Sequence, residues 1–149
     1  MKIMIGVDDS PHSRAAVEFV QKMTWPKGSK VIVVSVVRPV VAVYAEAYAP
    51  AGPYPAAVSE DLVRFHQETA VSAERDLQGA GLATEARIVH GDPRTALVDA
   101  ARGERADLLV MGSHGRTGMA KLLLGSVASH VVTHAPCSVM VVKLDRRAA

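Results

Sequence analysis

The chain has 149 residues, of which 49% are hydrophobic and 4% aromatic, and its 17 basic and 15 acidic residues give a formal net charge of +2. This length supports a single domain over residues 1–149 with a core of Val, Leu, Ile, Ala and Met, and the scattered basic residues argue against a nucleic-acid partner. One cysteine excludes an internal disulfide, no signal peptide precedes the first apolar run, and the longest apolar region is interrupted by Ser, Arg and Pro, so we expect a cytoplasmic protein with no membrane segment.

The first half of the chain begins with a short apolar run at residues 3–7, which predicts a buried strand. Ser10 followed by Pro11 is typical of a helix start, with the serine as N-cap and the proline at the first helical position. Residues 31–37 are β-branched and apolar and predict the second strand. Residues 38–57 are rich in Pro, Ala and Tyr without a clear period, so we expect a loop there.

The second half of the chain repeats this alternation. A helix is predicted from residues that recur at helical spacing, namely Leu62, Phe65, Thr69, Ala73 and Leu77. The third strand is predicted over residues 84–90, and the Asp-Pro pair at residues 92–93 repeats the helix-start pattern. Residues 106–111 predict a fourth strand, residues 127–135 a helix and residues 137–143 a fifth strand.

Strands that alternate with helices in this way predict an α/β protein with five parallel strands in one Rossmann-like sheet and helices on both faces. In such a sheet, ligands bind beyond the carboxyl ends of the strands, where the strand order reverses. Asp8 and Gly112 both follow predicted strands directly. We therefore expect the ligand site at these two strand ends.

The most informative pattern follows the fourth predicted strand. It reads Gly112-Ser113-His114-Gly115, then nine residues, then Gly125-Ser126, with a helix predicted from Val127. Backbone N–H groups between a strand end and a helix start can bind an anion, and glycine lets a phosphate approach the main chain. Ser126 can either cap the helix or donate to a phosphate oxygen. The pattern predicts a phosphate cradle for a nucleotide, and the chain contains neither a P-loop motif nor the dinucleotide-binding glycine motif.

Several side chains near this pattern have two interpretations. Arg116 and Lys121 can pair with phosphates or be solvated loop charges. His114 can contact phosphate or fill space as a neutral imidazole. Asp8 can accept hydrogen bonds from ribose hydroxyls or help to hold Mg²⁺, whereas Asp9 suits a turn that supports the helix start. The apolar residues 122–124 are expected to hold the loop against the core or a partner.

Other candidate sites are weaker. His130 and His134 lie four residues apart on a predicted helix, but no third metal ligand is evident, so we expect two surface histidines. Cys137 opens an apolar strand and is expected to be a buried, unreactive thiol. The Gly-Ser pairs lack the nucleophile-elbow pattern of serine hydrolases, so we expect no catalytic residues and no protein-bound metal.

Gly-x2-Gly-x9-Gly-Ser after a strand that ends in Val-Met resembles the nucleotide-binding signature of the universal stress protein family. Residues 3–10 resemble the family's first strand and its Asp-x-Ser turn, and residues 135–142 resemble its last strand. The resemblance covers nearly the whole chain and is weakest over residues 39–59, which form a variable loop in the family. It implies the strand order 3-2-1-4-5, with the switch point between strands one and four.

The resemblance also implies which residues bind a nucleotide. The positions of Gly6 and Val36 line the adenine, and the position of Asp8 lies by the adenosine. With the residues of the glycine pattern, the expected binding set is Gly6, Val7, Asp8, Val36, Met111, Gly112, Ser113, His114, Gly115, Arg116, Gly125, Ser126 and Val127. The expected ligand is ATP, with ADP and AMP as alternatives and Mg²⁺ as an ion that accompanies the phosphates.

These observations favour a cytoplasmic ATP-binding protein of stress response and regulation, with at most weak ATP hydrolysis, because Asp8 is the one candidate general base beside the loop. A slow ATPase or nucleotidyl-transfer enzyme of the same fold, and a dimeric scaffold that binds no nucleotide, stay open as alternatives. Residues 139–142 are apolar at consecutive positions, so we expect both faces of the last strand to be covered. Because the implied order places this strand at a sheet edge, we expect a homodimer through residues 137–143, and the resemblance points to the same contact.

Overall fold

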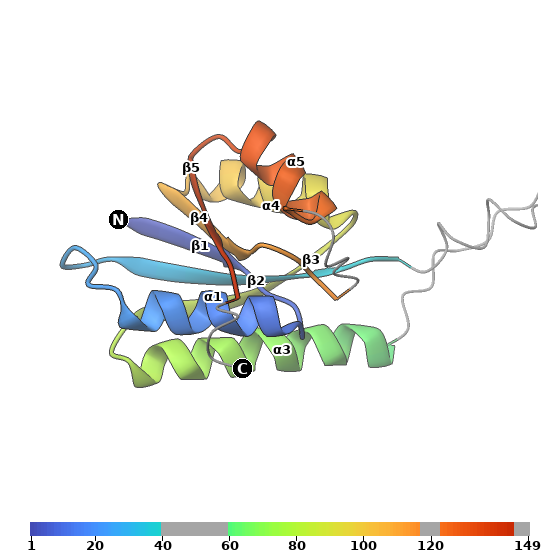
Figure 1. Cartoon of the computed structure of the whole chain (residues 1–149). Helices are drawn as coiled ribbons and strands as arrows, with labels where there is room; N and C mark the ends of the chain where they lie inside the picture. The colour runs from blue at the N-terminus through green and yellow to red at the C-terminus, as the bar shows by residue number, and fades with distance from the viewer. Residues whose placement is uncertain (40–59, 117–122, 145–149) are drawn as a thin grey trace, which may run out of the picture.

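A five-stranded parallel sheet forms the centre of the molecule, in a computed structural model that describes residues 1–39, 60–116 and 123–144 (Figure 1). Its strands are β1 (Lys2–Gly6), β2 (Lys30–Val37), β3 (Ala83–His90), β4 (Leu108–Gly112) and β5 (Ser138–Val142). Their order is β3-β2-β1-β4-β5, and each pair of neighbours is parallel. The predicted fold class and strand order are therefore confirmed.

Two helical layers cover the sheet (Figure 1). Helices α1 (Pro11–Lys22) and α3 (Glu60–Gly79) pack on one face, and α4 (Pro93–Glu104) and α5 (Ser126–His134) pack on the other. Successive residues of a strand point to opposite faces, so Ile3 and Ile5 of β1 join one buried cluster while Met4 joins the other. No helix within the described part of the chain is long and apolar enough to cross a membrane.

The helix starts decide which groups face the carboxyl edge of the sheet. As predicted, Ser10 caps α1 by accepting the Ser13 N–H, and Asp92 caps α4 by accepting the Arg94 N–H. Helix α5 differs, because its N-cap is Gly125 and no side chain caps it. Ser126 is the first helical residue, so its interpretation as a cap is wrong, and the first turn of α5 keeps N–H groups that no side chain satisfies.

The buried face of α3 differs in its first half from the predicted one. Its buried residues are His66, Ala70, Ala73 and Leu77, whereas Phe65 is 37% exposed. The apolar spacing favoured Phe65, but the buried position belongs to His66, the next residue. His66 can be buried because Ser35 of β2 is its hydrogen-bond partner, and this contact is not visible in the sequence pattern.

Parts of three predictions fall outside the described residues: most of the loop at 38–57, together with Lys121 and Leu122. Of the remaining leucines in the run at 122–124, Leu124 packs against the core, but Leu123 is 85% exposed. Leu124 therefore lies against the core as expected, whereas Leu123 does not, and a contact of Leu123 with a partner stays a prediction.

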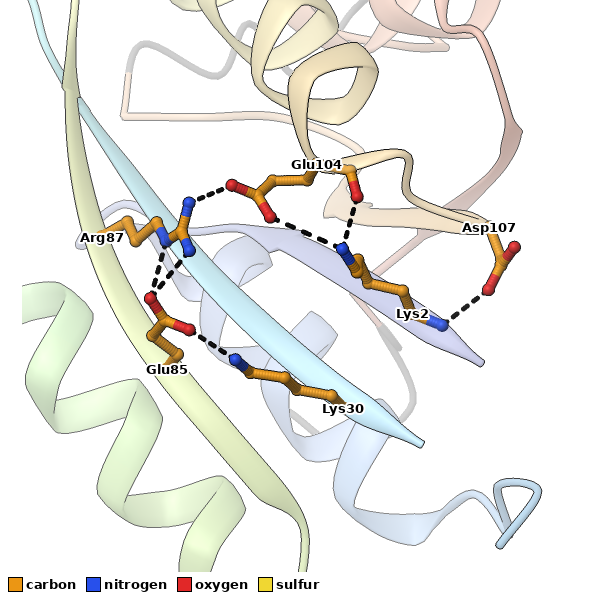
Figure 2. Close-up of polar contacts among 6 residues, drawn as sticks. All are labelled: Lys2, Lys30, Glu85, Arg87, Glu104 and Asp107. Atoms are coloured by element: carbon orange, nitrogen blue, oxygen red, sulfur yellow. Dashed lines mark hydrogen bonds and ion pairs between the residues drawn. The ribbon is translucent and has the colours of Figure 1, made fainter. Parts of the chain in front are cut away.

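A network of ion pairs joins the amino-terminal ends of the strands, away from the predicted ligand site (Figure 2). On β3, Arg87 pairs with Glu85 and with Glu104 at the end of α4, and Glu85 also binds Lys30 of β2. Lys2 of β1 donates to the Glu104 carbonyl over 2.6 Å. These contacts link β1, β2 and β3 to the end of α4, and they place charged residues on the β3 edge.

The opposite edge strand, β5, is apolar. Met140 packs toward one cluster, and Val139 and Val141 pack toward the other, but all three are only half-buried, and Val142 alone is buried. Each face of β5 is therefore covered in part, less than expected from the sequence. Unlike β3, this edge carries no charged side chain between residues 138 and 142 to prevent pairing with another strand.

Candidate functional site

A pocket of about 680 Å³ lies at the carboxyl ends of β1, β2 and β4, beside the N-terminal ends of α4 and α5. This volume lies in the range of small-molecule sites, and the position follows the rule for open parallel sheets. All predicted binding residues except Ser113 line it: Gly6, Val7, Asp8, Val36, Met111, Gly112, His114, Gly115, Arg116, Gly125, Ser126 and Val127.

The wall of the pocket next to the sheet is apolar. Val34 and Val36 of β2, Met111 of β4 and Leu97 of α4 line it and are at most 8% exposed. A Cβ added to Gly6 would lie 3.2 Å from Leu97 Cδ1, so the glycine lets Leu97 pack closely over β1. The result is an apolar slot suited to a flat ring system.

Asp8 lies at the end of β1 in a tightly bonded turn. Its N–H donates to Ser13 Oγ over 3.0 Å, and its Oδ1 accepts the Ser10 N–H over 3.0 Å. The Ser13 N–H in turn donates to Ser10 Oγ over 3.1 Å. A Cβ on Gly115 would lie 2.9 Å from Asp8 Oδ2, so the backbone of the glycine loop passes directly beside the carboxylate. The turn therefore fixes an acceptor group at the point where the loop meets β1.

The ends of the glycine loop are held by backbone hydrogen bonds. The Ser113 N–H donates to the Val142 carbonyl of β5, and the Gly125 N–H donates to the Ser113 carbonyl, each over 2.8 Å. Ser126 and Val127, in the uncapped first turn of α5, line the pocket. The N-terminus of α5 thus borders the pocket with N–H groups and partial positive charge, which is the chemistry that binds phosphate.

Ser113 lies behind the pocket, where it is 2% exposed. Its Oγ is 3.2 Å from Nδ1 of both His12 and His114, whose ring centroids are 5.1 Å apart. Burial lowers the pKa of His12, the neighbouring His114 lowers it further, and Asp8 acts in the opposite direction. Ser113 therefore ties the loop to α1, while His114 contributes to the pocket wall.

Arg116 lines the pocket but is already paired. Its Nε lies 2.8 Å from Asp9 Oδ1, and its guanidinium lies 5.3 Å from the centre of the Phe65 ring. These contacts connect the glycine loop to the start of α1 and to α3. Arg116 is thus not a fully solvated charge, its pairing with phosphate stays a prediction, and Asp9 contacts the glycine loop through Arg116.

Sequence reasoning missed several wall residues: Ser13, Val34, Arg38, His66, Asp92, Pro93, Arg94, Leu97 and Ala128. Asp92 lies two residues after the end of β3, just as Asp8 lies two residues after the end of β1. This equivalent position could have predicted that Asp92 lies at the pocket. Its Oδ2 lies 2.8 Å from Arg94 Nη2 and 3.6 Å from Arg38 Nη2. The hydrogen bond from the Arg94 side chain is the largest of the effects that lower the pKa of Asp92 to about 2, so this carboxylate is ionised at neutral pH.

The remaining candidates do not line the pocket. The His130 and His134 rings stack with centroids 4.1 Å apart, and no group of three metal-binding side chains occurs within residues 1–39, 60–116 and 123–144. Burial raises the pKa of the half-buried Cys137 thiol, which disfavours the reactive thiolate.

Comparison with known proteins identifies the family. The model of the Universal stress protein family matches residues 1–143. Universal stress protein MJ0531 of Methanocaldococcus jannaschii is 36% identical over 90 residues, which cover 60% of this chain and 53% of that protein, so the chain spans about half the length of this relative. A universal stress protein of Thermus aquaticus is 30% identical over 95% of this chain and 97% of its own length.

Solved structures agree with this match. Hypothetical protein MJ0577 of Methanocaldococcus jannaschii superposes with a TM-score of 0.80 at 26% identity, over 97% of this chain and 96% of that one. A universal stress protein in complex with cAMP superposes with a TM-score of 0.62 at 28% identity, over 95% of each chain. Because the family model matches residues 1–143 of its 149 residues, the chain belongs to the universal stress protein family.

Proposed function

We propose that this protein binds an adenine nucleotide in the pocket at the carboxyl edge of the sheet, with ATP as the principal ligand and ADP and AMP as alternatives. The observation that carries the proposal is one pocket that joins an apolar slot to a glycine loop and an uncapped helix N-terminus. A purine fits the slot, and phosphates fit the cradle. The cAMP-bound relative holds an adenine nucleotide on the same fold, which supports this choice.

The strand order suggests how the nucleotide lies. Neighbouring strands are about 4.8 Å apart, so a pocket that extends from β4 past β1 to β2 has room for three successive groups. The phosphates lie over β4, at Gly112, Gly115 and the start of α5. The ribose lies over β1 beside Asp8, and the adenine lies over β2 against Val36. Each part of the nucleotide then meets protein groups of matching chemistry.

Mg²⁺ fits this arrangement as a companion of the phosphates. Magnesium is commonly held by one or two carboxylates together with substrate phosphates. Asp8 is the carboxylate beside the glycine loop, since Gly115 passes within contact distance of its Oδ2. Asp9 is engaged by Arg116. Asp8 would therefore be the carboxylate that holds the ion beside the phosphates.

Substitution of Asp8 separates its two roles. If Asp8 accepts hydrogen bonds from the ribose, Asp8→Ala weakens ATP, ADP and AMP alike, by roughly 1.5–3 kcal/mol for hydrogen bonds to a charged group. If it mainly holds Mg²⁺, ATP binding falls and AMP binding does not. Asp8→Asn keeps an acceptor for the Ser10 N–H and serves as the control for the turn.

Mass analysis of the nucleotide released by denatured protein identifies the natural ligand. Recovery of no adenine nucleotide together with no affinity for added ATP would refute the proposal.

We also propose a homodimer through residues 137–143. The Val142 carbonyl accepts a hydrogen bond from Ser113 on the β4 side. Because the backbone groups of successive strand residues alternate in direction, those of Val141 point to the free edge. Val141→Pro then removes an edge donor without removing a bond to β4, and it should produce monomers in sedimentation experiments. Val141→Thr keeps the N–H and should remain dimeric. A wild-type protein that sediments as a monomer at micromolar concentration excludes the dimer.

The proposed role is regulatory: the protein acts in the cytoplasm during stress and transmits its nucleotide-bound state to a partner. A slow ATPase is the second candidate, favoured by the imidazole of His114 in the pocket wall, which has the chemistry of a general base. Phosphate release that is abolished by substitution of His114 would favour the enzyme. Binding without turnover would favour the regulatory role.

A further inference from the structure

One buried polar pair near the pocket has no part in the proposed binding of base or phosphate. His66 of α3 is 7% exposed, and Ser35 of β2 is fully buried. Ser35 Oγ lies 2.8 Å from His66 Nδ1. His66 also lines the pocket, whereas Ser35 does not. The serine therefore holds the ring from the side of the sheet, and the other ring nitrogen, Nε2, is the one available to the pocket.

Hydrogen-bond accounting fixes the tautomer of this imidazole. The Ser35 hydroxyl has no other acceptor among the residues that the structure describes, and a buried O–H without an acceptor is costly. If Nδ1 carried the proton, the hydroxyl would accept that proton and leave its own unsatisfied. The satisfied arrangement has the Ser35 O–H donating to Nδ1. The proton of the neutral ring then resides on Nε2, as a donor directed to the pocket.

The surroundings of His66 favour its neutral form, and the charged residues among them show that the ring lies near the start of α1. Burial lowers the pKa of His66, and the positive charge of Arg116 lowers it further, while Asp9 and Asp8 raise it. These three charged residues stand at the end of β1 and in the glycine loop, where the proposed ribose position lies. Nε2 donates no hydrogen bond to any described residue, so its donor capacity is unused by the protein there.

We propose that His66 is a specificity-determining residue that reads the ribose, with its Nε2–H donating to the oxygen of a hydroxyl whose own proton is accepted by Asp8. This inference rests on the proposed nucleotide site. A hydroxyl is both a donor and an acceptor, so the combination of one fixed carboxylate and one fixed N–H is complementary to it. A deoxyribose lacks the hydroxyl and leaves both protein groups without a partner, which is the arrangement that rejects an analogue most strongly.

Two substitutions separate the two nitrogens of the ring. Asparagine carries its polar atoms near the position of Nδ1, so His66→Asn keeps a partner for Ser35 and removes the donor to the pocket. Glutamine carries its amide near the position of Nε2, so His66→Gln keeps a donor to the pocket. The pair is matched in chemistry, and thermal melting of both variants reports their folding. Only a role in ligand contact predicts that they differ toward the ribose.

Calorimetric titration of the full chain with ATP, 2′-deoxy-ATP and 3′-deoxy-ATP tests the proposal. Wild type should bind ATP more than about tenfold more tightly than one of the deoxy analogues, because that analogue loses its bonds to both Asp8 and His66, and that analogue identifies the hydroxyl. His66→Asn should reduce this preference by about threefold to tenfold, and His66→Gln should keep most of it. Equal losses for all three ligands in His66→Asn, or a wild type that binds all three equally, would overturn the role of His66 while leaving the nucleotide site intact. Absence of ATP binding by wild type would overturn both.

A second measurement needs no variant. Nitrogen-15 NMR of the wild-type imidazoles distinguishes the two neutral tautomers. The Nε2–H form is expected for His66, with a shift of that nitrogen on addition of ATP that is smaller with the deoxy analogue. An Nδ1–H form would overturn the assignment, because Nε2 would then have no proton to donate.

Discussion

Gly112 tests whether the glycines of the signature have different roles. A Cβ at this buried position would lie 2.7 Å from the backbone C and O atoms of His12 and 2.9 Å from its Cβ. Those atoms belong to the first turn of α1, which Ser10 and Ser13 hold in place. Backbone fixed in this way cannot move aside easily, so Gly112→Ala should strain the contact between β4 and α1.

The expected cost of Gly112→Ala is that of overpacking, about 1–3 kcal/mol in the free energy of unfolding. For a chain of this size each kcal/mol lowers the melting temperature by roughly 2–4 °C. Thermal unfolding followed by circular dichroism measures the effect. Gly115→Val is the matched comparison: Gly115 is exposed, and the nearest atom to its added Cβ is a side-chain oxygen, Asp8 Oδ2 at 2.9 Å. This variant should melt near wild type but lose nucleotide binding. If Gly112→Ala melts within about 1 °C of wild type, the packing role of Gly112 is refuted.

Three further predictions concern stability. Thr84 Oγ1 is a buried oxygen without a hydrogen-bond partner in the described structure, so Thr84→Val should raise the free energy of unfolding by about 1 kcal/mol in denaturant titrations, and a loss of stability would show that the hydroxyl has a partner. Asp92→Ala removes the cap of α4 and should lower the free energy of unfolding by about 1 kcal/mol at neutral pH. Because folding lowers the pKa of Asp92 from 3.8 to about 2, its contribution to stability is present above pH 3.8 and disappears toward pH 2. The unfolding free energies of variant and wild type should therefore converge in acid. Glu85→Gln removes a carboxylate whose pKa is lowered chiefly by the hydrogen bond from Lys30. The substitution should lower the melting temperature at low salt and have less effect at about 1 M salt, because salt screens the interaction. Equal effects at both salt concentrations would contradict an electrostatic origin.

Much of the fold could be read from local patterns. Ser10 with Pro11, and Asp92 with Pro93, marked two helix starts correctly because capping and the fixed φ of proline act within a few residues. The continuous apolar runs predicted parallel strands buried on both faces. The strand order depended on the family resemblance, since no local pattern encodes which strands are neighbours.

The part of the site that could be predicted consists of residues that follow the ends of strands along the sequence. The glycine loop and Asp8 were found because each directly follows a strand, and parallel strand ends meet at one edge. His66, Leu97 and Arg38 were missed because their places in the pocket depend on how α3, α4 and the end of β2 pack. Ser113 was included as a neighbour of a glycine pair, but it is buried outside the pocket, where its hydroxyl contacts His12 of α1.

The central claim is that the pocket binds an adenine nucleotide through the glycine loop. Calorimetric titration of nucleotide-free wild type with ATP, beside Gly115→Val, tests it most directly. Wild type should bind one ATP per chain, and the variant should show no binding while melting near wild type. Wild type without measurable binding at ATP concentrations of about 1 mM, or Gly115→Val with wild-type affinity, would contradict it.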